Sequence, residues 1–168
     1  MTGTVHTMEQ RTLKERLLYA PRKGLFYWIN PPAAHAELLG EEAGSVQGGN
    51  KSYHAIQIDG VKYRRGRLAF LYMEGRWPTE CIDHINGNSL DDRWLNLREA
   101  TATQNAWNHK GRSKAADLPM GVRINSSGRF AARIGVNGTQ VQIGTFDTEE
   151  QAAEAYKIAR RKYFGQYA

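Results

Sequence analysis

Asp83 and His84 stand next to each other in an unusually polar stretch, CIDHINGNSLDDRWLNLREATATQNAWNHK (81–110), and Asn105 follows near its end. Carboxylate and amide oxygens are hard ligands that suit Mg²⁺ or Mn²⁺. Imidazole titrates near neutral pH, so a histidine beside such ligands can act as a general base. These residue types therefore favour a metal-assisted hydrolytic site over a loop that is merely polar.

Local signals predict the elements that position these side chains. Residues 81–85 are expected to form a short strand and residues 86–88 a turn. Thr101 and Gln104 make a capping box, which predicts that a helix carrying Asn105 begins directly after Thr101. Adjacent strand residues point to opposite faces. Either one member of the Asp-His pair enters a pocket while the other supports it, or a distortion lets both act.

Apolar residues of the same stretch are expected to pack into a core. They are Cys81, Ile82, Leu90, Trp94, Leu95 and Leu97. Since Cys81 is the single cysteine, a disulfide within the chain and a multi-cysteine zinc site are both excluded.

The motif DHINGNSLDDRWLNLREATATQN, with Asn108 just after it, resembles the HNH motif of phage HNH homing endonucleases. The preceding YRRGRLAFLYMEGRWP is similar to the lead-in of those enzymes, although Gly66 stands where many relatives have a histidine. That departure concerns a supporting contact rather than the chemistry.

The resemblance implies a role for each site residue. Asp83 and Asn105 would hold one Mg²⁺ or Mn²⁺ ion, with no zinc expected, and His84 would deprotonate the attacking water. Asn96 would hold the loop of the ββα unit together. His109 is expected to contact phosphate or solvent rather than the metal.

Residues 53–68 are predicted to form a basic β-hairpin around the turn signal Asp59-Gly60. Its second arm is expected to carry Arg64, Arg65 and Arg67. The charges are typical either of a solvated edge strand or of a ribbon that lies on DNA. The neighbouring HNH motif favours DNA binding. Upstream, a helix is predicted over 8–19 and a strand over 25–29.

The C-terminal region alternates polar and apolar residues, which predicts a three-stranded antiparallel sheet with a helix on its apolar face. The segment GVRINSSGRFAARIGVNGTQVQIGTFDTEEQAAEAYKIA is similar to the AP2 DNA-binding domain. That family lays its sheet in the major groove of double-stranded DNA. The residues expected to contact DNA are Arg123, Arg129, Arg133, Gln140 and Gln142.

The expected fold is α+β. An HNH domain with a basic N-terminal hairpin (1–110, ββα-metal core about 79–110) precedes a linker (111–119) and an AP2-like domain (120–168). The net charge is +6, and residues 1–80 and 111–168 carry the excess of Lys and Arg, which suits a polyanionic partner. No signal peptide or membrane span is expected, so the predicted location is the cytoplasm, that of a bacterial host if the chain is phage-encoded.

Two functions compete at this point. The favoured one is a metal-dependent, homing-like DNA endonuclease whose AP2 sheet recognises the site. The alternative is a non-catalytic AP2-type DNA-binding regulator. One active site per chain predicts a nick from a monomer, and a double-strand break only from a homodimer or from successive nicks.

Overall fold

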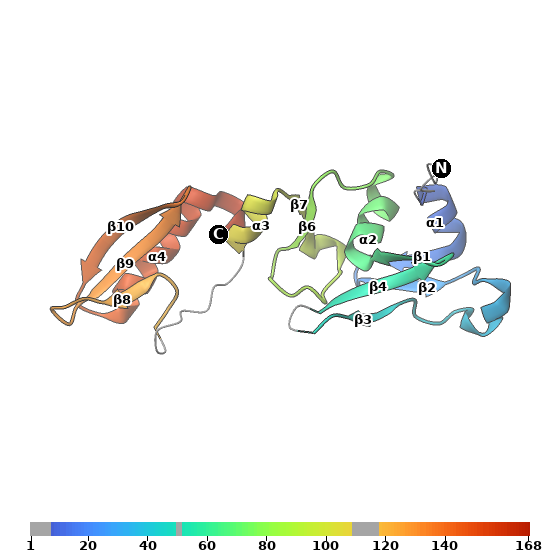
Figure 1. Cartoon of the computed structure of the whole chain (residues 1–168), viewed down its shortest axis with the longest axis horizontal. Coiled ribbons are helices and arrows are strands. Elements are labelled where there is room, and N and C mark those ends of the chain that lie inside the picture. Colours follow the sequence, from blue (N-terminus) through green and yellow to red (C-terminus); the bar gives the residue numbers. More distant parts are fainter. Residues whose placement is uncertain (1–7, 50–51, 109–117) are drawn as a thin grey trace, which may run out of the picture. The chain divides into compact units, whose positions relative to one another are not determined.

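The structure is a computed structural model that describes residues 8–49, 52–108 and 118–168 (Figure 1). The chain forms two compact units, Met1–Thr101 and Ala102–Ala168. The predicted helix that carries Asn105 therefore begins the second unit, whereas the sequence placed the domain boundary after residue 110. The predicted linker (111–119) lies mostly outside the described residues.

The first unit consists of short strands and helices. In chain order they are α1 (Gln10–Arg16), β1 (Leu17–Ala20), β2 (Leu25–Trp28), the 3-10 helix η1 (Ala33–Leu38), β3 (Ser45–Gln47), β4 (Tyr53–Ile58), β5 (Val61–Arg64), α2 (Arg65–Glu74), β6 (Cys81–His84), the 3-10 helix η2 (Trp94–Asn96) and β7 (Leu97–Ala100). The strands pair antiparallel as β1-β2, β3-β4-β5 and β6-β7. Asp59 and Gly60 both have positive φ, as the predicted hairpin turn between β4 and β5 requires.

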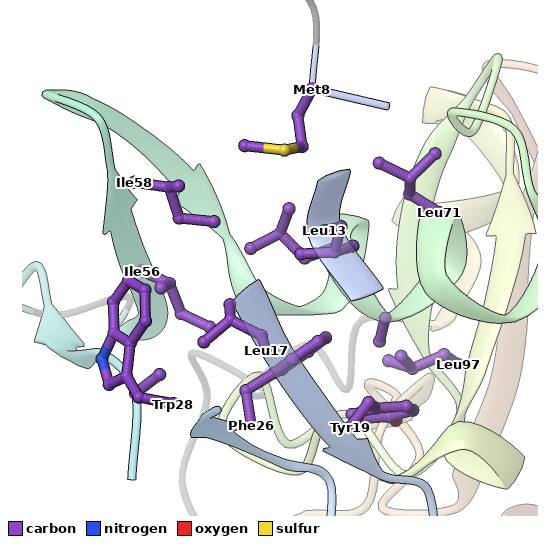
Figure 2. Packing of buried hydrophobic residues seen from close by; sticks show 13 residues of the cluster. Met8, Leu13, Leu17, Tyr19, Phe26, Trp28, Ile56, Ile58, Leu71 and Leu97 are labelled. Atoms are coloured by element: carbon purple, nitrogen blue, oxygen red, sulfur yellow. The ribbon is translucent and has the colours of Figure 1, made fainter. Parts of the chain in front are cut away.

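One hydrophobic core joins these small sheets. Figure 2 shows side chains from α1, the strand pair β1-β2, β4, α2 and β7 converging on it. Leu13, Leu17, Phe26, Ile56 and Leu68 are fully buried there. The core therefore gives β6, β7 and the loop between them a fixed base, although each of these strands has only four residues.

The second unit is a sheet covered by a helix. Its elements are α3 (Ala102–Asn108), β8 (Val122–Ile124), β9 (Phe130–Val136), β10 (Thr139–Phe146), α4 (Glu149–Phe164) and the 3-10 helix η3 (Gly165–Tyr167). The strands form an antiparallel meander in the order β10-β9-β8, and α4 packs against all three. Thr148 caps α4 by accepting a hydrogen bond from the backbone N–H of Gln151. The predicted sheet and helix are thus confirmed.

Several local predictions are wrong because tertiary packing overrides the pattern. The helix predicted over 8–19 ends at Arg16, since Leu17 begins a strand that pairs with Trp28. Leu17 is buried and Leu18 is half exposed, which is the alternation of a strand. Leu13 and Leu17 fit one face of a helix equally well, so the sequence did not separate the two readings.

Side chains predicted to be buried are exposed in three places. Cys81 is exposed at the start of β6, and Leu95 is 91% exposed in the turn that η2 makes. Leu90 is 37% exposed in the loop between β6 and β7. In the described residues, no helix is both long and apolar enough to cross a membrane.

Candidate active site

Asp92 is the centre of the polar cluster in the first unit. Its side chain is only 3% exposed, and three donors converge on its carboxylate. His84 Nε2 lies 3.0 Å from Oδ1, while His54 Nδ1 and Arg65 Nε lie 3.1 and 3.0 Å from Oδ2. The backbone of Asp92 is held as well, since its carbonyl accepts a hydrogen bond of 2.6 Å from Tyr19. The carboxylate is therefore a fixed anchor for two imidazoles.

The ionisation of Asp92 decides which nitrogen of His84 is basic. Burial alone would raise the pKa of Asp92, but hydrogen bonds from His84 and Arg65 outweigh it and hold this pKa below its usual value. An ionised carboxylate only accepts hydrogen bonds. His84 must therefore carry a proton on Nε2, and in the neutral imidazole Nδ1 has the lone pair.

The loop that carries Asp92 packs against the turn between β1 and β2. The backbone N–H of Trp94 donates to the carbonyl of Pro21 at 2.9 Å. Gly24 has a φ of +73°, and a Cβ there would come within 2.4 Å of the backbone nitrogen of Arg93. Only glycine permits this close approach, so the turn at Gly24 helps to fix Asp92.

Asp83 takes a different partner from its neighbour His84. Its side chain is 3% exposed, and its Oδ2 accepts a hydrogen bond of 2.7 Å from Arg98 Nε. Asp83 and Arg98 are also directly opposite each other in the β6-β7 register. Asp83 and His84 therefore have different partners, Arg98 and Asp92, although they are neighbours in β6.

Asn96 ties the β6-β7 loop together. Its Oδ1 accepts from the backbone N–H of Asn86 at 3.0 Å, and its Nδ2 donates to Asn86 Oδ1 and to the carbonyl of Asp91. Its own carbonyl accepts from the N–H of Ile85. These bonds fix the path of the chain between His84 and Asp92. Asn86 and Asn88 form turns within the loop, as their spacing around Gly87 predicts.

Asn105 lies in α3, which begins directly after Thr101 as the capping box predicts. The structure thus brings Asp92, His84 and His54 together in the first unit and places Asn105 in the second. Asn108 ends the same helix. His109 lies outside the described residues.

The donor chemistry of the expected metal ligands is compatible with Mg²⁺ or Mn²⁺. A carboxylate has about four lone-pair sites, so Asp83 can accept from Arg98 and still bind an ion. Asn105 would add a neutral amide oxygen, and both donors are hard. Among the described residues, no group of three or more His, Cys, Asp or Glu is arranged to hold a metal ion.

The basic residues expected on the hairpin divide into two kinds. Arg64 is exposed at the end of β5, 4.5 Å above the Tyr53 ring. Arg65 instead begins α2 and is 2% exposed, paired with Asp92 and Glu42. The expectation that Arg65 lies on an exposed arm is wrong, because the hairpin ends at residue 64 and the helix turns this side chain inward.

Arg67 also lies in α2 rather than on the hairpin. Its guanidinium donates to the backbone carbonyls of Pro78 and Glu80 at 3.2 and 3.3 Å. It therefore supports the segment that leads into β6. Of the three arginines expected on the hairpin, Arg64 alone keeps an exposed strand position.

The sheet of the second unit exposes the polar side chains that the sequence assigned to DNA. Arg123, Arg129, Arg133, Gln140 and Gln142 are all exposed. Arg133 on β9 lies directly opposite Gln142 on β10. Arg129 is different, since its Nε is 2.8 Å from Asp147 Oδ1.

Sequence reasoning missed Asp92 and His54. Asp92 stands inside the motif but reads as one of two loop aspartates, and His54 is far away in the hairpin. One feature of the sequence pointed to them, because Gly66 stands where many relatives have a histidine. A Cβ at Gly66 would lie 3.2 Å from Asp92 Oδ1, so this position borders the same carboxylate that His54 contacts.

Comparison with known proteins identifies two domains. Residues 63–107 match the HNH endonuclease family, and residues 118–166 match the AP2 domain. An uncharacterised HNH endonuclease of Acanthamoeba polyphaga mimivirus is 34% identical over 120 residues, which are 70% of this chain and 62% of that protein. This chain therefore spans less than two thirds of that relative.

Plant transcription factors match shorter stretches of the chain. An AP2-like ethylene-responsive transcription factor of Arabidopsis thaliana is 47% identical over 58 residues, covering 33% of this chain and 10% of that protein. One from Oryza sativa subsp. japonica is also 47% identical over 58 residues, or 33% of this chain and 9% of its own length. No solved structure is significantly similar to this chain.

Proposed function

Since the chain carries an HNH endonuclease domain followed by an AP2 domain, we propose that it is a metal-dependent DNA endonuclease whose AP2 sheet selects the site. The observation that carries the proposal is the fixed His84–Asp92 pair within the matched segment. A buried carboxylate that orients a histidine is a general device for preparing a base. A DNA-binding regulator has no need of it.

In the proposed reaction, His84 Nδ1 takes a proton from a water molecule. The water oxygen attacks the scissile phosphorus, and the bond from phosphorus to the 3′-oxygen breaks. The departing 3′-oxygen takes up a proton from solvent water, so the products are a 5′-phosphate end and a 3′-hydroxyl end, and the imidazolium returns its proton to solvent. Asp92 holds the imidazole in the required tautomer and stabilises the imidazolium that forms.

Asp83 and Asn105 are the proposed metal ligands. Bound there, Mg²⁺ or Mn²⁺ would offset the negative charge that develops on the phosphate and the departing oxygen. Arg98 donates a hydrogen bond to Asp83, which fixes the carboxylate, and its positive charge offsets the negative charge there. Asn96 maintains the loop geometry that sets His84 and Asp92 together.

Double-stranded DNA is the proposed substrate. The exposed Arg and Gln side chains of the β8–β10 sheet would contact it, with Arg64 adding charge from the first unit. Since a chain has one His84, a monomer should nick one strand, and a double-strand break needs a dimer or successive nicks.

A plasmid-nicking assay tests the proposal. Wild-type protein with Mg²⁺ or Mn²⁺ should relax supercoiled DNA, and His84→Ala should lower the rate by about 10²-fold or more. Asp92→Asn should also lower the rate by about 10²-fold while leaving the gel shift of DNA unchanged, because an amide cannot hold the same tautomer.

His35→Ala is the matched control. His35 is exposed and contacts Glu37, away from the Asp92 cluster, so its removal should leave nicking unchanged. If wild-type protein shifts DNA on a gel but leaves plasmids from several phage and bacterial genomes intact, the chain is a DNA-binding regulator and not a nuclease.

A further inference from the structure

His54 in β4 contacts the same carboxylate that orients His84. Its Nδ1 lies 3.1 Å from Asp92 Oδ2, and the side chains of His54 and Asp92 are 16% and 3% exposed. Because the Asp92 carboxylate is ionised and only accepts hydrogen bonds, His54 carries a proton on Nδ1. Two imidazoles therefore share one buried carboxylate, with His84 on Oδ1 and His54 on Oδ2.

The other donor to Oδ2 leaves the carboxylate incompletely held. Arg65 donates through Nε to Asp92 at 3.0 Å and through Nη1 to Glu42 at 2.8 Å, so its fork is divided between two carboxylates. A guanidinium that donates both bonds to one carboxylate fixes the plane of that group, whereas a single bond lets it rotate. His54 supplies the second bond to Oδ2, which keeps Oδ1 turned toward His84.

The strand that carries His54 is itself fixed against the loop that carries Asp92. Ile56 of β4 is fully buried in the core of the first unit. Just before the strand, the carbonyl of Ser52 accepts a hydrogen bond of 2.6 Å from Ser89 Oγ in the loop between β6 and β7. The loop thus meets the start of β4 at two points, and His54 makes one of them.

We propose that His54 is a positioning residue for the general base: by bonding to Asp92 Oδ2, it keeps Oδ1 in place to accept Nε2–H of His84. The inference rests on the proposed nuclease function, which makes His84 the base. All of these contacts lie within the first unit. The segment that matches the HNH endonuclease family begins at residue 63, so the catalytic unit of this chain extends upstream of it into β4.

The tautomer of His84 in the full chain, without metal or DNA, tests this inference. In alkaline buffer, where imidazole is neutral, nitrogen-15 NMR of the wild-type protein should show His84 protonated on Nε2. His54→Ala should raise the ratio of the Nδ1–H to the Nε2–H tautomer by about tenfold, the factor that one hydrogen bond to a charged group is typically worth. The exposed His35 should give an unchanged signal in the same spectra.

His54→Asn is the matched variant. Its amide nitrogen is as many bonds from the backbone as His Nδ1, so it can donate to Asp92, but it has no counterpart of Nε2. It should keep the wild-type tautomer of His84 and the wild-type nicking rate. His54→Ala should nick about tenfold more slowly while its gel shift of DNA is unchanged. Circular dichroism checks folding, and His54→Leu, which fills the space without a donor, replaces His54→Ala if that variant is unfolded.

Two results would overturn the inference. One is a wild-type tautomer of His84 in the variants that lack a donor at position 54. The other is a His54→Asn protein that keeps the tautomer but nicks as slowly as His54→Ala, because His54 would then act through Nε2. If wild-type protein does not nick at all, the nuclease proposal fails, and the tautomer comparison still decides whether His54 orients His84.

Discussion

The two units treat charged side chains in opposite ways. In the first unit the charged side chains of Arg65, Asp83 and Asp92 are buried, whereas no charged side chain described in the second unit is buried to that degree. The arginines of the β8–β10 sheet are exposed, and Arg129 meets Asp147 at the surface. Burying a charge is costly unless it is paired and hydrogen-bonded. The first unit bears that cost at the residues around His84.

This difference fits the work that each unit is proposed to do. A general base must be held in one tautomer and one orientation before the substrate arrives, which calls for fixed partners in a dry setting. Side chains that contact DNA must stay accessible and exchange water or counterions for phosphates and bases. The same residue type, arginine, is thus buried and paired at position 65 and exposed at position 133.

Replacing the buried Arg65 should have the largest effect on stability. Arg65→Met leaves Asp92 with its charge buried and short of one partner, so the free energy of unfolding should fall by about 3 kcal/mol. Urea unfolding followed by tryptophan fluorescence measures this change. The exposed neighbour gives the matched control, since Arg64→Met should change the free energy of unfolding by less than about 0.5 kcal/mol. Equal losses in the two variants would contradict the contrast between buried and exposed arginines.

Much of the fold could be predicted because it depends on local patterns. The turn at Asp59-Gly60, the start of α3 after Thr101 and the alternation in β9 are signals of sequence neighbours. The second unit is built almost wholly from such signals. Its three strands and its helix were therefore predicted, although Ile124 was expected on the buried face and is 57% exposed.

The supporting residues of the candidate site could not be predicted in the same way. Asp92 meets His54 and Arg65, which are 38 and 27 positions away in the chain. No spacing rule links a hairpin histidine to a loop aspartate, since their contact depends on how β4, α2 and the loop pack. The stacking of Trp107 in α3 on Phe164 in α4 is likewise a contact between distant segments. Because the sequence does not reveal this contact, α3 was assigned to the first domain, whereas it belongs to the second unit.

An intermediate effect is expected when the exposed arginines of the second unit are replaced. Arg133→Ala should weaken binding to the cognate site by about tenfold and reduce the dependence on salt, because one base or phosphate contact is lost. Slow nicking of unrelated DNA should persist. Arg129→Ala should have a smaller effect, since Asp147 already engages that guanidinium. Fluorescence anisotropy at several salt concentrations measures both, and an equal loss of cognate binding and of non-specific nicking would argue against separate recognition and cutting surfaces.

The smallest expected effect is a loss of stability at low pH, and it compares the two units within one protein. A hydrogen bond from Arg93 lowers the pKa of Asp91 to about 2, and one from Arg76 lowers that of Glu99 to about 2. The pKa of Asp92 is also lowered, as described above. A carboxyl whose pKa is lower in the folded state contributes stability above its unfolded pKa and loses it as pH falls through the folded value. All three groups lie in the first unit.

The free energy of unfolding of the first unit should therefore stay level from neutral pH to about pH 5 and decline between about pH 4 and pH 2. Urea titrations at each pH, followed by amide NMR signals assigned to each unit, would resolve the two. Glu99→Gln should flatten part of the decline, because Glu99 pairs with Arg76 near the surface and its replacement leaves the ion pairs of Asp92 in place. A parallel decline of both units would mean that general charge repulsion, and not the ion pairs around the β6-β7 loop, governs the response to acid.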